Sequence, residues 1–295
     1  YAEHGGPEVL SVEEVERPKP GYGDLLVRVE AAGINPVDTY FREGEYPVPE
    51  LPWTPGADAA GVVETVGPGT EGFEEGDRVF ATGLGNWNQG TCAEYARVPS
   101  DHAAVLPDGC SFEEGAALGL VGVTAWQALV HHAELEPAEC VLVHSGSGGV
   151  GHVAVQLAAA TGAEVTTTAS PQYHDTLRVL GADTVLDYTR ADLAEAITAA
   201  GAPDVILDTF ANEYAELDFE VAAERGRVVA IGNTGPTAPV PMGPGKFKDL
   251  RFQVMSMFNT PDTGAVLSRL GTLLAAGRVV PEVARTYTLA ETADA

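Results

Sequence analysis

Three glycines, Gly146, Gly148 and Gly151, form a G-x-G-x-x-G spacing within the segment HSGSGGVG (144–151). In dinucleotide-binding domains the first glycine of this pattern allows a tight turn, and the second lets the backbone approach a pyrophosphate. The third lets the following helix pack closely against the strand. A helix that begins there also directs unpaired N–H groups and a positive dipole end at the phosphates. The spacing alone is common, so its meaning depends on the elements around it.

The elements around the glycines are those that such a loop requires. CVLVH (140–144) is a short apolar run that predicts a buried strand, and HVAVQLAAATG (152–162) predicts a helix that ends at Gly162. We therefore predict that the turn binds a pyrophosphate. Its predicted contacts are Ser145, Gly146, Gly148, Gly149, Val150 and Gly151.

The same alternation continues along the chain. Further strands are predicted at 163–169, 183–188, 203–210, 226–232 and 251–258, and helices at 170–181, 191–201 and 262–277, with a weaker helical signal over 211–224. Strands that alternate with helices predict a parallel, doubly wound α/β sheet of the Rossmann type.

Before about residue 118 the pattern differs. Short strands such as 25–34, 59–67 and 76–82 are separated by turns rich in Gly and Pro, which predicts a β-rich unit.

The end of the second strand bears on which dinucleotide is bound. An acidic residue at this position holds the ribose 2′-OH in many NAD-binding domains. Here the strand ends TTTASPQ, with no Asp or Glu at its tip, which favours NADP because nothing there repels a 2′-phosphate. No Arg or Lys lies there either, and the nearest cation in sequence is Arg178.

The charge of the chain excludes one class of partner and suggests an environment. Its 295 residues include 43 acidic and 16 basic side chains, a net charge of −27, with only three lysines. Binding to nucleic acid needs basic stripes, so we predict none. Acidic residues spread along the whole chain favour adaptation to high internal salt over an ordinary acidic protein, because salt screens their mutual repulsion.

Other features of the composition concern location. No apolar run reaches the length of a membrane span, and the N-terminus has no secretory pattern. Three widely spaced cysteines, Cys92, Cys110 and Cys140, argue against a disulfide framework. We therefore expect a cytoplasmic protein with no membrane partner.

Two longer segments carry a family resemblance. AAGINPVDTYFREGEYPVPELPWTPGADAAGVVETVG and VLVHSGSGGVGHVAVQLAAATGAEV resemble the zeta-crystallin-type quinone oxidoreductases of the medium-chain dehydrogenase/reductase superfamily. The resemblance implies a GroES-like domain over 1–118, to which 260–295 return, and a Rossmann domain over 119–259. It implies an active site between them, NADPH as cofactor and a quinone as substrate. We expect a homodimer, and because the family continues beyond LAETADA, we expect this sequence to be part of a longer chain.

The resemblance also implies site residues. It places Asn35 and Thr124 beside the nicotinamide, and Tyr40 and Tyr46 as aromatic side chains near the substrate, where a phenol could donate to a quinone oxygen.

The three positions of the family's 2′-phosphate site correspond to Ala169, Tyr173 and Tyr188 in this chain, so the lysine that the family uses there is absent. The remaining predicted cofactor contacts are the uncharged donors Ser170, Tyr173, His174 and Tyr188, together with Gly232 and Asn233. Asp38 and His144 are predicted to be structural.

Zinc-dependent relatives differ at three positions. Where they carry a Cys, a His and a second Cys as ligands, this chain has Asn35, Ala57 and Leu120, and three cysteines cannot form their four-cysteine structural site. We therefore predict no metal. Without a Lewis acid, electron-poor acceptors are favoured over alcohols. Two alternatives to quinone reduction remain open, an NADPH-dependent reductase of enone or alkenal double bonds and a non-enzymatic NADPH-binding protein.

Overall fold

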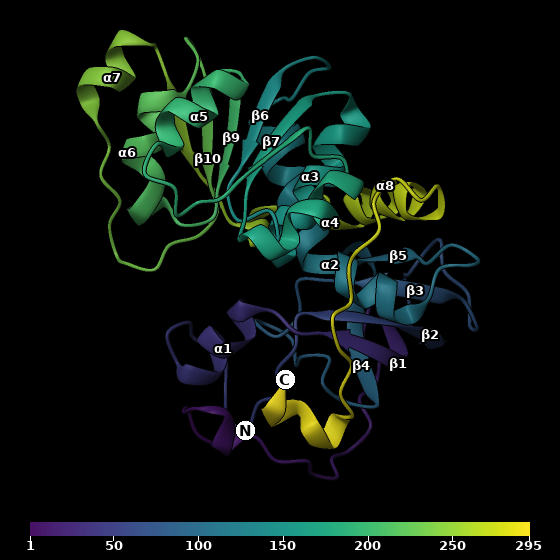
Figure 1. The fold of residues 1–295 in the computed structure, drawn as a ribbon. Helices are drawn as coiled ribbons and strands as arrows, with labels where there is room; N and C mark the ends of the chain where they lie inside the picture. The colour runs from purple at the N-terminus through teal and green to yellow at the C-terminus, as the bar shows by residue number, and fades with distance from the viewer. The chain divides into compact units, whose positions relative to one another are not determined.

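The computed structural model describes residues 1–295, and the chain divides into two compact units. Unit 1 contains residues 1–123 and 261–295, and unit 2 contains residues 124–260. Both are drawn in Figure 1. No helix combines the length and the apolar character that crossing a membrane would require.

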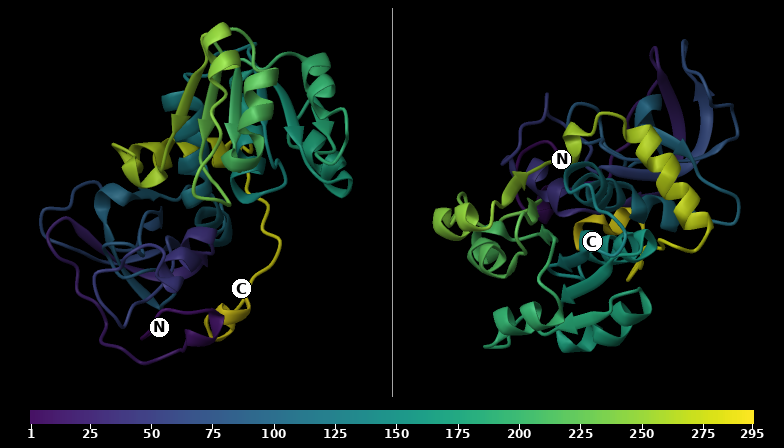
Figure 2. Two further views of the ribbon diagram at one scale, coloured as in Figure 1. Left: turned by 90° about the vertical axis from the view of Figure 1, so that its left-hand side faces the viewer. Right: turned by 90° about the horizontal axis from the view of Figure 1, so that it is seen from above.

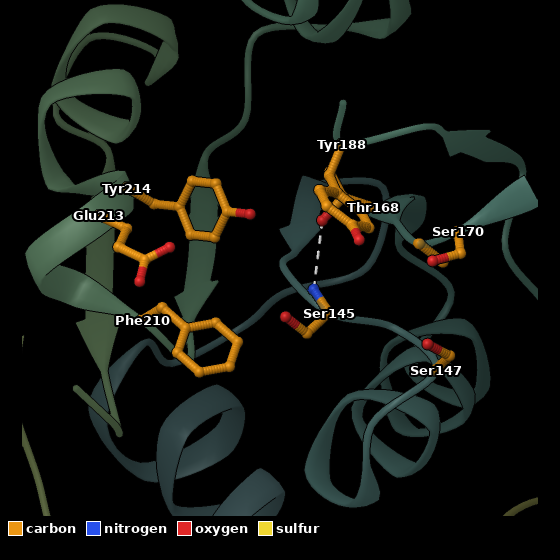
Figure 3. A pocket seen from close by; sticks show the side chains of 9 residues that line it. Ser145, Ser147, Thr168, Ser170, Tyr188, Phe210, Glu213 and Tyr214 are labelled. Atoms are coloured by element: carbon orange, nitrogen blue, oxygen red, sulfur yellow. Dashed lines mark hydrogen bonds between the residues drawn. The ribbon is translucent and has the colours of Figure 1, made fainter. Parts of the chain in front are cut away.

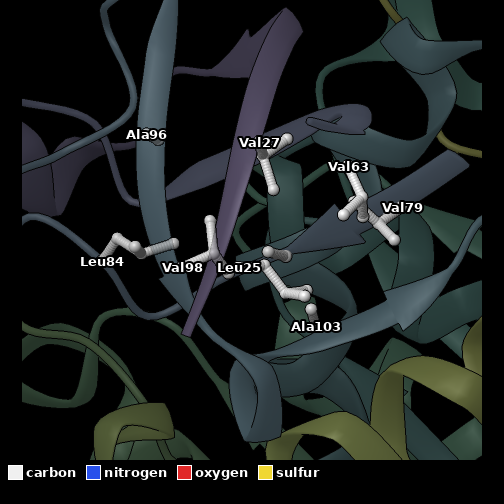
Figure 4. Packing of buried hydrophobic residues seen from close by; sticks show 9 residues of the cluster. Leu25, Val27, Val63, Val79, Leu84, Ala96, Val98 and Ala103 are labelled. Atoms are coloured by element: carbon white, nitrogen blue, oxygen red, sulfur yellow. The ribbon is translucent and has the colours of Figure 1, made fainter. Parts of the chain in front are cut away.

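Unit 1 is built on an antiparallel sheet with the strand order β4-β1-β2-β3-β5. Its strands are β1 (Asp24–Gly33), β2 (Asp58–Val66), β3 (Arg78–Ala81), β4 (Tyr95–Pro99) and β5 (Ala103–Val105). Alternate apolar side chains of neighbouring strands, among them Leu25, Val27, Val63 and Val98, are almost fully buried and form the core shown in Figure 4. The predicted β-rich unit is confirmed.

The helices of unit 1 have recognisable ends. They are α1 (Pro36–Glu43), α2 (Phe112–Trp126) and α8 (Thr263–Ala275); α2 reaches across the boundary and continues as a π-helical turn over Gln127–His132. Pro36 opens α1 and Gly44 ends it with φ 82°. At the start of α2, Ser111 and Glu114 each accept a hydrogen bond from the other's backbone N–H, a capping box.

Unit 2 contains a parallel six-stranded sheet with the order β11-β10-β9-β6-β7-β8. Its strands are β6 (Cys140–Val143), β7 (Glu164–Thr168), β8 (Thr184–Leu186), β9 (Val205–Asp208), β10 (Arg227–Ala230) and β11 (Arg251–Val254). The strand order reverses at β6, which pairs with β7 on one side and β9 on the other. Ligands bind outside the carboxyl ends of the strands at such a switch point.

Helices connect these strands. They are α3 (Gly149–Thr161), α4 (His174–Val179), α5 (Leu193–Ala200), α6 (Ala211–Val221) and α7 (Met242–Phe247). Because parallel crossovers are right-handed, α3 and α4 cover one face of the sheet while α5 and α6 cover the other; Figure 2 shows the sheet from two further directions. The doubly wound α/β fold predicted from the alternation is confirmed. One element is shorter than expected, since 170–181 begins with a 3-10 turn over Pro171–Tyr173 before α4.

Candidate functional site

The glycine-rich loop joins β6 to α3 and is built so that only glycine fits at two positions. A Cβ on Gly146 would lie 2.1 Å from Oγ1 of Thr167, and a Cβ on Gly151 would lie 2.1 Å from the carbonyl oxygen of Ser145. Cβ atoms in proteins essentially never come closer than 3 Å to such a heavy atom, so a side chain at either position forces the loop to move. This tight packing brings the loop backbone and the N-terminus of α3 to the carboxyl edge of the sheet, as pyrophosphate binding requires.

Ser145 fixes the loop in place. It adopts a left-handed conformation with φ 57°, its N–H donates to Oγ1 of Thr168 at 3.2 Å, and its hydroxyl accepts from Oγ1 of Thr209 at 3.1 Å. The N–H of Gly146 donates to the carbonyl of Thr168 at 2.8 Å. The loop is therefore held to the ends of both β7 and β9, the two strands that flank β6.

A pocket of about 340 Å³ opens beside this loop, within unit 2 (Figure 3). Hydroxyl groups and aromatic rings dominate its lining, and Glu213 is the only lining residue with a formal charge. The lining residues are Ser145, Ser147, Thr168, Ala169, Ser170, Tyr188, Phe210, Glu213 and Tyr214. A slot with aromatic walls and hydroxyl donors beside a glycine-rich loop is suited to the nucleoside half of a dinucleotide.

The predicted cofactor residues do not all lie in this pocket. Ser145, Ser170 and Tyr188 line it. Tyr173 and His174 do not, because the turn after Ser170 directs them elsewhere: Nε2 of His174 lies 3.1 Å from the carbonyl oxygen of Ala169 and donates to it, and Tyr173 is 43% exposed. Phe210, Glu213 and Tyr214 were missed by the sequence reasoning. Their position directly after β9, a neighbour of β6 at the switch point, is the signal that could have identified them.

The other predicted contacts of unit 2 lie at strand and helix ends. A Cβ on Gly232, which follows β10, would lie 2.5 Å from the carbonyl oxygen of Thr209, so this position also needs glycine. The neighbouring Asn233 donates through its side-chain amide to the carbonyl of Gly235 at 2.8 Å. Thr124 is buried in α2.

A buried ionisable cluster lies behind the aromatic wall of the pocket. His144, at the end of β6, is fully buried; its Nε2 lies 2.8 Å from Oδ1 of Asp218, and its ring stacks on Tyr214 at 4.4 Å. Burial alone would lower the pKa of His144, but the carboxylate of Asp218 outweighs it and raises the pKa. The prediction that His144 is a packed, hydrogen-bonded histidine is confirmed.

Asp208 adds a second carboxyl group to this cluster. Burial, and then the charge of Asp218, raise the pKa of Asp208 to about 7. One oxygen of each carboxyl group is buried without a donor from the rest of the protein. With its pKa raised to about 7, Asp208 keeps its proton at a pH where an exposed Asp would have lost it.

The raised pKa of Asp208 predicts a pH-dependent stability. The unfolded chain loses the proton of Asp208 near its ordinary pKa of about 4, whereas the folded chain keeps it to about 7. The unfolded state therefore binds fewer protons between these values, and the contribution of Asp208 to stability falls as pH rises from about 4 to 7. We expect the Asp208→Asn variant to lose this slope and to gain relative to wild type, by up to a few kcal/mol, at pH 8. Urea unfolding of both proteins at pH 4.5, 6 and 8 measures the difference. A constant difference across this range would contradict the raised pKa of Asp208.

In unit 1, Asn35 belongs to a buried network of amides and carboxylates. Its side-chain Nδ2 donates to Oδ2 of Asp58 at 2.8 Å, and its backbone N–H donates to Oδ2 of Asp38 at 2.8 Å. Burial raises the pKa of Asp38 to about 7 and that of Asp58 to about 6. The structural role predicted for Asp38 is confirmed by this bond. Asp58, which sequence reasoning missed, fixes which way the amide of Asn35 faces.

Tyr40 and Tyr46 lie together at α1 and the turn after it. Their rings meet edge to face at 5.6 Å and 80°, and Tyr46 makes a similar contact of 5.6 Å with Phe41. The backbone N–H of Tyr46 donates to the carbonyl of Tyr40 at 3.2 Å, which holds the turn against the helix. Tyr46 is 46% exposed, so this aromatic pair is partly open to solvent as well as packed edge to face.

The three positions at which zinc-dependent relatives carry ligands also come together. Asn35 donates to Asp58, the N–H of Leu120 donates to the other oxygen of Asp58 at 2.8 Å, and Ala57 is its buried chain neighbour. The oxygens of Asp58 are thus already engaged by N–H donors, and no group of three or more His, Cys, Asp or Glu side chains could hold a metal ion. This donor set does not suit a cation.

We expect activity to be independent of zinc, because amide donors occupy the place of the ligands. Dialysis against a chelator should leave turnover unchanged, and elemental analysis should find no stoichiometric zinc. Activity that is lost on chelation and restored by zinc would contradict the assignment of Asn35, Ala57 and Leu120 as non-ligand positions.

Comparison with known proteins agrees with this architecture. Residues 21–108 match the family model of the alcohol dehydrogenase GroES-like domain, and residues 149–272 match that of the zinc-binding dehydrogenases. The chain is 40% identical over 242 residues to a quinone oxidoreductase of Mus musculus, covering 79% of this chain and 72% of that protein. It belongs to the zeta-crystallin-type quinone oxidoreductases of the medium-chain dehydrogenase/reductase superfamily.

Solved structures of quinone oxidoreductases match the chain over nearly its whole length. That of Pseudomonas syringae is 34% identical with a TM-score of 0.88, covering all of this chain and 93% of the other. That of Escherichia coli, a complex with NADPH, is 33% identical with a TM-score of 0.84, covering 96% and 89%. The family predicted from the two sequence segments is confirmed. The family model named for zinc binding thus matches a quinone oxidoreductase that has Asn35, Ala57 and Leu120 at the positions where zinc-dependent relatives carry their ligands.

Proposed function

We propose that the protein is an NADPH:quinone oxidoreductase that works without zinc. The observation that carries the proposal is the glycine-rich loop beside the hydroxyl- and aromatic-lined pocket, in a chain whose relatives are quinone oxidoreductases and include one in complex with NADPH. Gly146 and Gly151 leave the space that a pyrophosphate-binding backbone needs. NADPH supplies the hydride when it is bound, and the protein supplies position and polarity.

The chain's own residues would divide this work between the two ends of the cofactor. In unit 2 the loop and the N-terminus of α3 bind the pyrophosphate, and the pocket binds the adenosine half. In unit 1, Asp58 accepts a hydrogen bond from the side-chain amide of Asn35, the residue that we propose for the nicotinamide end. The phenol of Tyr40 would donate a hydrogen bond to a quinone oxygen as that oxygen gains charge, and the ring of Tyr46 packs edge to face against that of Tyr40.

The preference for NADPH follows from the hydroxyl groups of the pocket. Ser170 and Tyr188 are neutral donors for a 2′-phosphate, and each such hydrogen bond contributes about 0.5–1.5 kcal/mol. We expect kcat/KM to favour NADPH over NADH by about tenfold to a hundredfold. Ser170→Ala and Tyr188→Phe should each reduce this ratio by lowering NADPH use alone. Tyr173→Phe, outside the pocket, is the matched control. Equal use of NADH by the wild type would refute this position of the 2′-phosphate.

The reaction is tested by NADPH oxidation at 340 nm with a naphthoquinone and an alkenal side by side. We expect turnover with the quinone, reduced at least tenfold by Tyr40→Phe because the developing charge loses its donor. Faster turnover with the alkenal would make the protein a double-bond reductase. NADPH binding without turnover of either would make it a binding protein.

We also propose that the protein forms a homodimer through β11, which is an edge strand of the parallel sheet. Val254 of β11 is 68% exposed, and Phe247 of the preceding helix α7 is 86% exposed. The segment 240–258 carries Lys246, Lys248 and Arg251 against one acid, Asp249, although the whole chain has a net charge of −27. Two copies can therefore meet at this edge without the repulsion expected elsewhere. Sedimentation should show a dimer that Val254→Glu converts to a monomer, and a monomeric wild type would exclude this interface.

The absence of disulfides bears on location. All three cysteines are free, which suits the reducing cytoplasm in which we propose that the protein acts.

A further inference from the structure

Glu213 stands apart from every other residue of the nucleotide pocket. It lies in the first turn of α6 and is the only lining residue with a formal charge. Figure 3 shows its carboxylate between the rings of Phe210 and Tyr214, on the wall opposite Ser170 and Tyr188. The proposed function gives this carboxylate no role, and its charge opposes the phosphates that the rest of the site is built to bind.

The carboxylate of Glu213 is held by a directed chain of hydrogen bonds. The side chain of Asn212 donates to Oγ1 of Thr234 at 2.8 Å and accepts from the N–H of Thr234 at 2.7 Å. The hydroxyl of Thr234 therefore has its own proton free to donate, and it donates to Oε1 of Glu213 at 2.9 Å. Oε2 of Glu213 makes no hydrogen bond within the protein. One oxygen is thus anchored, and the other is left for a ligand.

The chemistry of the slot defines that ligand. An ionised carboxylate only accepts hydrogen bonds, so its partner must present an N–H or O–H group. Aromatic rings line both sides of the slot, Phe210 and Tyr214 on one and Tyr188 on the other, which suits a planar partner. An adenine ring meets both conditions because its 6-amino group is a donor on the edge of a flat ring. A base with a 6-oxo group instead presents an acceptor, which a carboxylate repels.

We propose that Glu213 recognises the 6-amino group of the cofactor's adenine and so selects adenine dinucleotides over those with a 6-oxo base. This inference rests on the proposed function, because it takes the pocket to be the adenosine subsite. It also separates the tasks of the two walls. The wall that carries Glu213 recognises the base. Ser170 and Tyr188, on the opposite wall and away from the carboxylate, bind the 2′-phosphate.

The test compares binding of NADPH with binding of its hypoxanthine analogue, in which a 6-oxo group replaces the 6-amino group. Calorimetry gives both dissociation constants without any acceptor substrate. We expect the wild type to bind the adenine form about tenfold more tightly, a modest factor because Glu213 lies at an exposed edge of the pocket. Glu213→Gln should bring the ratio to within about twofold of one, since an amide can also donate to the 6-oxo group. Glu213→Ala should lose the preference by weakening adenine binding alone.

Two further variants make the result specific. Glu216→Gln, an exposed acid on the same helix that does not line the pocket, should leave the ratio unchanged. Thr234→Val, which removes the anchoring hydroxyl without touching the carboxylate, should shift the ratio in the same direction as Glu213→Gln.

Three other results are possible, and they would contradict base selection, contact with the ligand and the proposed function, respectively. If Glu213→Ala weakens both dinucleotides equally, the carboxylate binds ribose hydroxyls and does not select the base. If it weakens neither, Glu213 makes no contact with the ligand. If the wild type binds neither dinucleotide, the proposed function itself fails, and with it the adenosine assignment of the pocket.

Discussion

Replacing Gly151 with alanine is expected to weaken NADPH binding more than a hundredfold. The added Cβ would lie 2.1 Å from the carbonyl oxygen of Ser145 and 2.9 Å from Cα of Gly146, both backbone atoms of the loop. Backbone cannot rotate away as a side chain can, so loop and helix must separate by about 1 Å to reach ordinary contact distance. A displacement of that size misplaces the N–H groups that bind the pyrophosphate, and a hundredfold loss corresponds to about 2.7 kcal/mol.

Two other glycines are graded controls for this substitution. A Cβ on Gly148 would meet only the carbonyl oxygen of Ser145, at 3.2 Å, and a Cβ on Gly243 would meet nothing within 4 Å. We expect a small loss for Gly148→Ala and none for Gly243→Ala. Calorimetric titration with NADPH, with thermal unfolding measured in parallel, separates a local loop defect from general destabilisation. Binding by Gly151→Ala within threefold of wild type would show that the loop is not a rigid cradle.

Molar salt is expected to stabilise the fold strongly. The 16 basic side chains can neutralise fewer than half of the 43 acidic ones, which leaves a net charge of −27. At 0.1 M salt the Debye length is about 10 Å, so neighbouring surface carboxylates repel one another, whereas at 1 M it is about 3 Å. Relief of this repulsion favours the compact state, in which the charges lie closest together.

We expect the midpoint of thermal unfolding to rise by roughly 10 °C or more between 0.1 M and 3 M KCl, equivalent to about 3–5 kcal/mol for a chain of this size. Sucrose at matched osmolality is the control, because it stabilises by exclusion from the surface without screening charge. A midpoint that stays flat or falls with KCl, or that rises equally in sucrose, would contradict adaptation to high salt.

Local sequence determined the elements of this protein and the nature of its loop. The apolar run at 140–144, the glycines that follow it and the helix after them are defined by residues next to one another in the chain, and β6 and α3 lie where that pattern predicts. The alternation of strands and helices likewise predicted the doubly wound sheet, since burial on both faces and right-handed crossovers leave few other arrangements. Two family-specific segments then identified the family.

Only the tertiary structure decided which distant side chains share a site. Glu213 and Phe210 reach the pocket because β9 pairs with β6 across more than 60 residues of chain, while Tyr173, a near neighbour of Ser170 in sequence, lies outside it. The hydrogen bonds between His144 and Asp218 and between Asn35 and Asp58 also join separate elements. Periodicity carries information over a few residues, whereas sheet order, burial and the direction of a side chain after a turn depend on long-range packing. The sequence therefore specified a dinucleotide-binding loop, and the packing of the sheet determined what surrounds it.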